Sequence, residues 1–180
     1  MTLALQFFFQ VFIICFLLGF VTQAQGEPEK IVAGWVEKII LAPQQLKLRA
    51  KLDTGAKTSS IHAVDVKTFE RNEQPWVRFT LPAVDVEDAK PHQVEAEVVR
   101  TVLIKRHKLD SMRRIVVELD FCMDGGYYRS EFTLANRTNY NYPVLLGRRF
   151  LENHIIVDPS EKFLHSKKLK GLKCHKAENS

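Results

Sequence analysis

The sequence contains few of the motifs by which metal, nucleotide and covalent chemistry are recognised. No His-Glu-x-x-His occurs, and no two of the six histidines lie four residues apart, so a helical zinc motif is absent. A zinc site assembled from the distant His62, His154 and Asp53 has no support from spacing. The stretch Gly55-Ala56-Lys57-Thr58 lacks the spacing of a phosphate-binding loop, so ATP is not expected. No Gly-x-Ser-x-Gly surrounds a serine, which leaves a serine nucleophile unsupported.

Cysteine is scarce, and the chain has neither internal repeats nor low-complexity segments. Cys15 is not preceded by the small residues of a lipoprotein cleavage site. In an oxidising compartment Cys122 and Cys174 could pair and join the C-terminal segment to the body of the protein. Cys122 could equally be a buried thiol, because separation along the chain does not determine distance in space. The sequence leaves both states open.

Polar residues are scarce near the N-terminus, where Leu3 to Val21 is almost wholly apolar. Thr22 and Ala24 supply the small residues of a cleavage site, so we predict a signal peptide over residues 1–24 and export, to the periplasm. No Lys or Arg precedes the apolar run, and about 19 apolar residues nearly span a bilayer. An uncleaved N-terminal membrane anchor is therefore the alternative.

All charged residues follow the apolar N-terminal segment, and the 26 basic and 21 acidic residues there give a net charge of +5. The length of this remaining part of the chain suits one domain with a hydrophobic core, which we place at residues 33–164. Residues 165–180 form a basic C-terminal tail that we expect to be solvated. A basic surface favours acidic peptides, anionic lipid or anionic glycans. Nothing in the sequence indicates a nucleic-acid partner.

Helical periodicity is rare, and most of the chain alternates with the period of a β-strand. Apolar and basic residues alternate from Leu46 to Leu52, as in a half-buried strand. Further strands are expected on both sides of turns at Glu70–Glu73 and Asp124–Gly126, and from Val94 to Leu103. Arg148–Glu152 is the one expected helix. About eight short strands predict a mainly β fold, a closed or nearly closed barrel with one short helix.

Asp53-Thr54-Gly55-Ala56 ends the alternating run and occurs once. Gly55 would let the backbone turn sharply, so that the turn presents the Asp53 carboxylate. A carboxylate aimed at a water molecule works in a pair that shares one proton, because two like charges about 3 Å apart do not both ionise. One chain supplies one such carboxylate. If the motif is catalytic, the protein should be a homodimer in which the Thr54 hydroxyl bonds across the two-fold axis.

A second apolar segment belongs with this turn. Val144-Leu145-Leu146-Gly147-Arg148 is suited to pass beneath it as a buried strand, with Arg148 in a structural ion pair near the dimer interface. The two segments together resemble the retropepsin-like aspartic peptidases, and above all a bacterial family long labelled "putative ATP-dependent zinc protease" and linked to glutamate ligases. The matching stretches are Gly34-Trp35, 50–63, 69–71, 76–79, 133–137, 145–148 and 157–159.

The resemblance implies a single-lobed acid-protease barrel that dimerises and hydrolyses peptide bonds with a water activated by Asp53 of each subunit. It assigns the support of the active-site turn to Thr54, Gly55, Ala56 and Thr58, and the buried strand under the turn to Leu145, Leu146, Gly147 and Arg148. It implies a peptide or protein substrate and no cofactor. An acidic substrate would suit the net positive charge of the protein. Candidates for a flap over the site are the loop 81–93 and the hairpin at 70–73.

Two alternatives of a different class stay open at this point. The protein could be a zinc-dependent peptidase, in keeping with the older family label. It could also be a non-catalytic module that binds peptides on the same fold.

Overall fold

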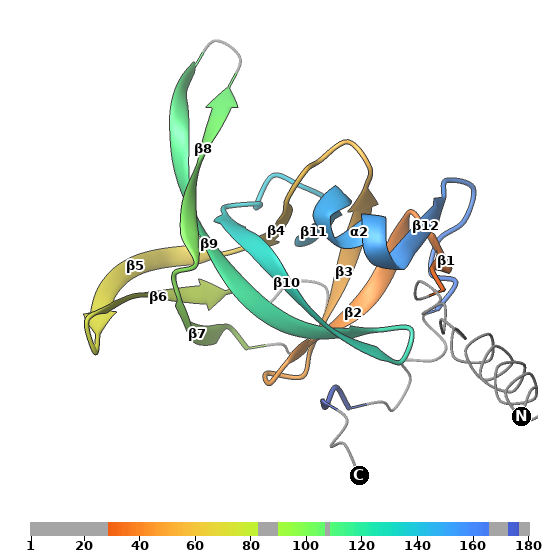
Figure 1. The fold of residues 1–180 in the computed structure, drawn as a ribbon, viewed down its shortest axis with the longest axis horizontal. Helices are drawn as coiled ribbons and strands as arrows, with labels where there is room; N and C mark the ends of the chain where they lie inside the picture. Colours follow the sequence, from red (N-terminus) through yellow and green to blue (C-terminus); the bar gives the residue numbers. More distant parts are fainter. Residues whose placement is uncertain (1–28, 83–89, 107–108, 166–172, 177–180) are drawn as a thin grey trace, which may run out of the picture.

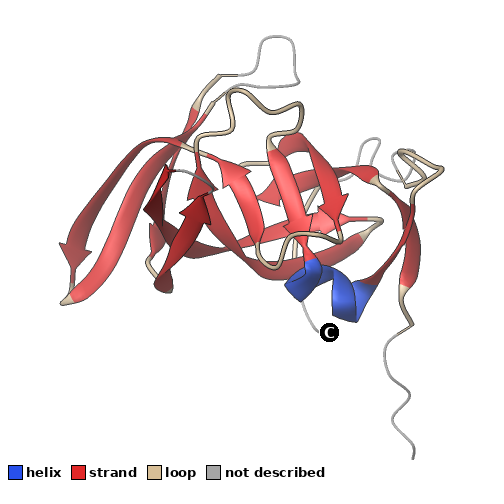
Figure 2. Cartoon of the chain, turned by 90° about the horizontal axis from the view of Figure 1, so that it is seen from above, coloured by secondary structure: helices blue, strands red, loops and turns tan. Residues whose placement is uncertain are grey.

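A computed structural model describes residues 29–82, 90–106, 109–165 and 173–176 (Figure 1). The predicted signal peptide and most of the loop 81–93, a candidate flap, lie outside these ranges. Among the described residues, no helix has the length and apolar character needed to cross a membrane. Strands dominate, and the single described helix lies at the lower edge of the molecule in Figure 2.

The elements follow one another from the N-terminus as strands, apart from one helix between the last two. They are β1 (Ile31–Gly34), β2 (Val36–Ala42), β3 (Leu46–Asp53), β4 (Ser59–His62), β5 (Val64–Arg71), β6 (Gln74–Leu81), β7 (His92–Glu97), β8 (Arg100–Arg106), β9 (Leu109–Met123), β10 (Gly126–Ala135), β11 (Val144–Gly147), α2 (Arg148–His154) and β12 (Ile155–Asp158).

Six strands close into a barrel. Their order is β10-β4-β11-β3-β2-β9, and β9 pairs back onto β10, which closes the ring. Strand β8 extends from β9 as a projecting hairpin, and β5, β6 and β7 form a separate three-stranded sheet beside it (Figure 1). A short parallel pair of β1 and β12 completes the fold. The predicted fold class, a mainly β closed barrel with one short helix, is confirmed.

Both predicted hairpin turns form where expected. Asn72 and Glu73 connect β5 to β6 with φ values of 52° and 61°. Asp124 and Gly125 connect β9 to β10 with φ values of 52° and 81°. Positive φ at both central residues matches the right-handed twist of the strands that such a turn joins.

The predicted single strand from Val94 to Leu103 is wrong, because the chain changes sheet within it. Strand β7 pairs with β6, whereas β8 pairs with β9. At the break, the Val98 amide donates to the Pro75 carbonyl at 2.8 Å, and the Val99 amide donates to the Val116 carbonyl at 3.0 Å. Two adjacent apolar residues, Val98 and Val99, interrupt the alternation here, and each bonds to a strand of a different sheet.

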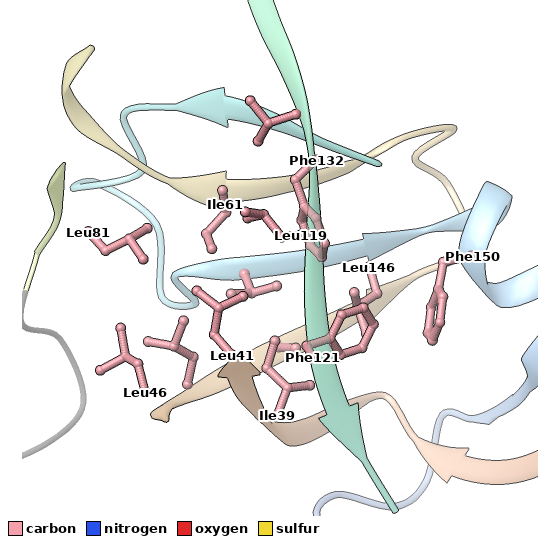
Figure 3. Close-up of a cluster of buried hydrophobic side chains, with 14 of the residues drawn as sticks. Ile39, Leu41, Leu46, Ile61, Leu81, Leu119, Phe121, Phe132, Leu146 and Phe150 are labelled. Atoms are coloured by element: carbon pink, nitrogen blue, oxygen red, sulfur yellow. The ribbon is translucent and has the colours of Figure 1, made fainter. Parts of the chain in front are cut away.

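The core fills the barrel with side chains from the inward positions of its strands (Figure 3). Leu46, Leu48, Ala50 and Leu52 are all buried, as their alternation predicts. An aromatic cluster occupies the end near α2, where Phe121 packs edge-on against Phe132 and Phe150 at centroid distances of 5.8 Å and 5.2 Å (cluster residues Phe121, Phe132, Phe150, Tyr128). Burial of each large apolar side chain contributes about 1.5–3 kcal/mol.

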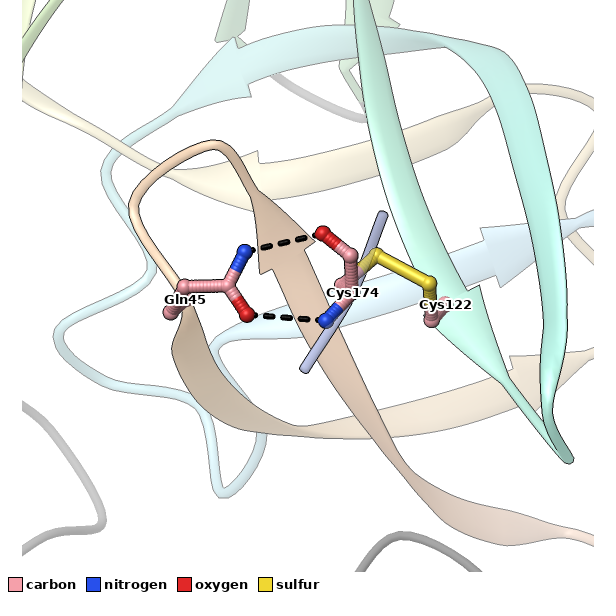
Figure 4. The surroundings of a disulfide bond; sticks show 3 residues. All are labelled: Gln45, Cys122 and Cys174. Atoms are coloured by element: carbon pink, nitrogen blue, oxygen red, sulfur yellow. Dashed lines mark hydrogen bonds between the residues drawn. A yellow bond between two sulfur atoms is a disulfide. The ribbon is translucent and has the colours of Figure 1, made fainter. Parts of the chain in front are cut away.

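The C-terminal tail is not wholly solvated, so that expectation is wrong at two places. Cys174 is 2% exposed and forms a disulfide with Cys122, across 52 residues of sequence. The Gln45 side chain donates to the Cys174 carbonyl at 2.9 Å and accepts from its amide at 2.8 Å (Figure 4). Nearer the domain, the fully buried Glu37 carboxylate accepts from the amides of Leu164 and His165. Both contacts fasten the tail to strands of the barrel.

Candidate active site

Asp53 ends β3 in a turn that its own side chain organises. Its Oδ1 accepts a hydrogen bond from the Gly55 amide at 3.0 Å, and its carbonyl accepts from the Ala56 amide at 3.2 Å. We expected Gly55 to supply conformational freedom, but its φ is not in the left-handed region. Its lack of a side chain provides room instead, since a Cβ would lie 3.2 Å from Asp53 Oδ1.

Strand β11 lies between β3 and β4, directly beside this turn. It runs parallel to β3, with Gly147 opposite Asp53, and antiparallel to β4. Glycine is needed at position 147, because a Cβ there would lie 2.7 Å from the Thr58 carbonyl carbon. The Gly147 amide donates to Ser59 Oγ at 3.1 Å. Leu146 and Gly147 are buried and Leu145 is half-buried, so this part of the predicted segment forms a strand beside the turn. Its last residue, Arg148, does not belong to the buried strand, because it is exposed and begins α2.

Arg148 holds the outer side of the turn. Its Nη1 donates to the carbonyls of Thr54 at 3.0 Å and Gly55 at 2.8 Å, and its amide donates to the Ala56 carbonyl at 2.9 Å. Within the described residues of one subunit the guanidinium bonds to neutral carbonyl oxygens, and the structural ion pair expected near the dimer interface stays a prediction. The side chain therefore braces the turn that carries Asp53.

The charge of Asp53 is set by a neighbour on its own strand. Lys51 Nζ lies 3.2 Å from Asp53 Oδ2, since residues two apart on a strand share a face. Burial raises the pKa of Asp53, but the Lys51 ammonium and the amides of Gly55 and Ala56 outweigh it and hold the pKa below its ordinary value. A single subunit thus keeps this carboxylate ionised.

Lys51→Met should raise the pKa of Asp53 toward its ordinary value, because the ammonium that stabilises the anion is lost. Ionised Asp53 stabilises the fold above its unfolded-state pKa, and this contribution disappears as pH falls through the lower folded-state pKa. The Lys51→Met variant should lose part of the stability that ionised Asp53 contributes. A carbon NMR titration of the Asp53 carboxyl measures the shift. Lys57→Met, at an exposed lysine of the same turn, should leave the titration unchanged, and an unshifted Asp53 in Lys51→Met would contradict the assignment.

The Asp53 carboxylate opens onto a pocket of about 340 Å³, lined by Trp35, Lys51, Asp53, Arg137, Tyr140, Asn141, Tyr142 and Leu145. One wall is aromatic: the rings of Trp35 and Tyr142 meet edge-on at 5.9 Å. Four lining residues, Arg137, Tyr140, Asn141 and Tyr142, come from the 136–143 loop between β10 and β11. The pocket is large enough for an amino-acid side chain beside the carboxylate.

Sequence reasoning missed most of this pocket. Arg137 and Trp35 occur in the stretches that carry the family resemblance, but no pattern gave them a role. Tyr140 and Tyr142 lie in a connection without strand periodicity, and they reach the site because β11 follows it and inserts beside β3. The stretch 133–137, which belongs to the family resemblance, contains two polar residues, Asn136 and Arg137. These were the available signal for a role in the site.

The residues considered for zinc do not come together in the described part of the chain. His62 is buried, and its Nδ1 accepts from the Arg137 amide at 2.9 Å, which is a structural hydrogen bond. His154 lies on α2 and packs against the rings of Phe150 and Tyr128. Within the described ranges, no three His, Cys, Asp or Glu side chains gather as a metal site would require.

A closed β-barrel in which an apolar-apolar-Gly strand passes beneath an Asp-Thr-Gly turn defines the acid-protease class in its single-lobed form. The model of one family, described as "Retropepsin-like aspartic endopeptidase RimB", matches residues 32–168. The chain belongs to this RimB-like family.

Known relatives include both larger proteins and one of similar size. "Probable alpha-L-glutamate ligase" proteins of Shewanella pealeana and Desulfotalea psychrophila are 38% and 32% identical over 64% and 63% of this chain. The chain spans about a quarter of the length of these curated relatives. A Legionella pneumophila crystal structure of a protein with unknown function is 35% identical, with a TM-score of 0.66 over 76% of this chain and 99% of that one.

Proposed function

We propose that this protein is an aspartic endopeptidase that works as a homodimer, with Asp53 of each subunit in one active site. The observation that carries the proposal is the Asp53 turn: its carboxylate is ionised, braced by Arg148 and β11, and open to a pocket. Membership of a family of aspartic endopeptidases supports the same chemistry. One such carboxylate per chain calls for a second subunit.

The proposed reaction divides the two carboxyl groups between two tasks. The ionised Asp53 accepts a proton from a water molecule, whose oxygen bonds to the peptide carbonyl carbon while the protonated Asp53 of the other subunit gives its proton to the carbonyl oxygen. The tetrahedral intermediate then collapses as the C–N bond breaks. The carboxyl group that took the proton of the water gives it to the leaving nitrogen, and the other carboxylate takes a proton from a hydroxyl of the intermediate, so the dyad again holds one proton.

The roles of the neighbouring residues follow from their contacts. Thr54, Gly55 and Ala56 form the turn that aims the carboxylate, and Thr58 packs its backbone against Gly147. Leu145 also lines the pocket, where it would contact substrate. The proposal needs no metal and no nucleotide, since the two carboxyl groups supply both the acid and the base.

The substrate and the compartment are further parts of the proposal. The net charge of +5 favours an acidic peptide, and glutamate is named in the relatives' description, "Probable alpha-L-glutamate ligase". An apolar N-terminal stretch supports export. The Cys122–Cys174 disulfide supports an oxidising compartment such as the periplasm.

Activity should depend on subunit concentration and not on chelator. We expect the purified protein to cleave a glutamate-rich peptide between about pH 4 and 7, where a carboxylate dyad titrates. The rate per subunit should rise with concentration until dimers saturate, as sedimentation measures in parallel. Loss of activity in chelator that zinc restores would favour a zinc-dependent peptidase. Absence of turnover with peptide still bound would favour a non-catalytic binding module.

A further inference from the structure

Arg137 is a buried cation at the edge of the Asp53 pocket. It is 8% exposed, and it follows β10 where that strand pairs with β4. Its Nε donates to the Tyr142 carbonyl at 3.0 Å, and its Nη1 donates to Ser60 Oγ at 2.8 Å. Both acceptors are neutral, so these bonds fix the plane of the guanidinium without cancelling its charge.

No carboxylate of the described residues forms an ion pair with Arg137, in contrast to several other arginines of the protein. Glu95 pairs with Arg71 and Arg78, and Glu131 pairs with Arg149. Burial lowers the pKa of Arg137. Tyr140 opposes this effect, the charge of Arg114 adds to it, and Asp53 opposes it more weakly, so the pKa stays below its ordinary value. A buried cation without a counter-ion is costly, and a carboxylate that entered the pocket would remove the cost.

The guanidinium keeps hydrogen-bonding capacity for such a carboxylate. It carries five N–H groups in a planar fork, and its bonds to described residues use Nε and one N–H of Nη1. The fork matches the two oxygens of a carboxylate. Arg137 and Lys51 carry positive charge in the pocket lining and Asp53 carries negative charge, so the pocket has a net positive charge even with Asp53 ionised.

The other lining residues suit the stem of an acidic side chain. Trp35, Tyr142 and Leu145 offer apolar surface on which methylene groups can pack, and the ring of Tyr140 lies 4.6 Å from the guanidinium carbon of Arg137. The cationic group therefore lies in a pocket with apolar walls, next to the carboxylate that would hold the water.

We propose that Arg137 is a specificity-determining residue that binds the side-chain carboxylate of a glutamate or aspartate beside the scissile peptide bond. The inference rests on the proposed function, which it deepens by assigning acidic recognition to one side chain rather than to the overall charge of the surface. Lys51 is engaged by Asp53, so Arg137 supplies the carboxylate-binding group of the pocket.

The test measures binding to a protein that does not cleave. Asp53→Asn protein is titrated with two peptides that differ only by Glu or Gln at one position, and the fluorescence of Trp35 reports the pocket, with Trp76→Phe removing the second tryptophan. We expect the Glu peptide to bind about tenfold more tightly, the size of a hydrogen-bonded charge pair. Adding Arg137→Gln should reduce the Glu/Gln ratio to about one, and leave binding of the Gln peptide within about threefold.

Further variants separate this role from a structural one. Arg137→Lys keeps the charge but loses the fork, so the ratio should fall partway, and Arg149→Gln, at an exposed arginine outside the pocket, should leave it unchanged. If the Asp53→Asn protein, with Arg137 intact, bound the Glu and Gln peptides equally tightly, the inference would be overturned. A preference that survives Arg137→Gln and disappears in Lys51→Met would also overturn it. Cleavage is scored separately on the wild-type protein, so failure of the peptidase function is distinguishable.

Discussion

Asp53→Asn should lower peptidase activity by about 10³-fold, because an amide neither accepts a proton from water nor shares one with its partner. The fold should persist. The amide oxygen still accepts from the Gly55 amide, and the lost contact with Lys51 is a partly exposed ion pair, worth about 0–1 kcal/mol. Steady-state rates on a glutamate-rich peptide measure the effect, with sedimentation to verify the dimer.

Asp65→Asn is the matched control for that substitution. Asp65 is an exposed aspartate at φ 52°, a conformation that asparagine also tolerates, and it lies on β5 of the three-stranded sheet. The control should keep full activity. Wild-type rates in the Asp53→Asn protein would remove the aspartic mechanism, and an equal loss in Asp65→Asn would show that the effect is not local.

Gly147→Ala should destabilise the protein by about 1–3 kcal/mol, the cost of overpacking a buried site. Its Cβ would lie 2.7 Å from the Thr58 carbonyl carbon and 3.0 Å from the Thr58 amide nitrogen, and a backbone does not yield as a flexible side chain does. Strand β11 or the turn must shift, so activity should fall together with stability. Urea unfolding and peptide cleavage measure the two effects.

Gly125→Ala separates stability from activity. Gly125 has φ 81° in the turn between β9 and β10, and its Cβ would meet nothing within 4 Å. The substitution should therefore cost about 1–2 kcal/mol through backbone strain alone, and leave activity unchanged. If Gly147→Ala lost no more activity than Gly125→Ala, β11 would not position the Asp53 turn.

Local patterns carry much of the fold. The alternation from Leu46 to Leu52 places β3 and its buried face, and Asp124-Gly125 places a hairpin, because both depend on neighbours in sequence. The turn and the strand beneath it were also recognisable, since their residue types are demanding. Steric contact with Thr58 leaves room only for glycine at position 147.

Contacts between segments that are distant in the sequence could not be predicted from local patterns. The switch of sheet at Val98 and Val99 depends on partners at Pro75 and Val116, which no local pattern identifies. Arg137 enters the pocket because β10 and β4 run side by side. The state of Cys122 had to stay open for the same reason, since Cys174 returns to it through tertiary structure.

The central claim is that two Asp53 carboxylates, one from each subunit, form one active site. It is tested most directly by exchanging subunits between wild-type and Asp53→Asn proteins at fixed total concentration. Mixed dimers would carry one carboxylate and be inactive, so activity should fall as the square of the wild-type fraction. Activity in simple proportion to the wild-type fraction would mean that each subunit works alone, and would contradict the account.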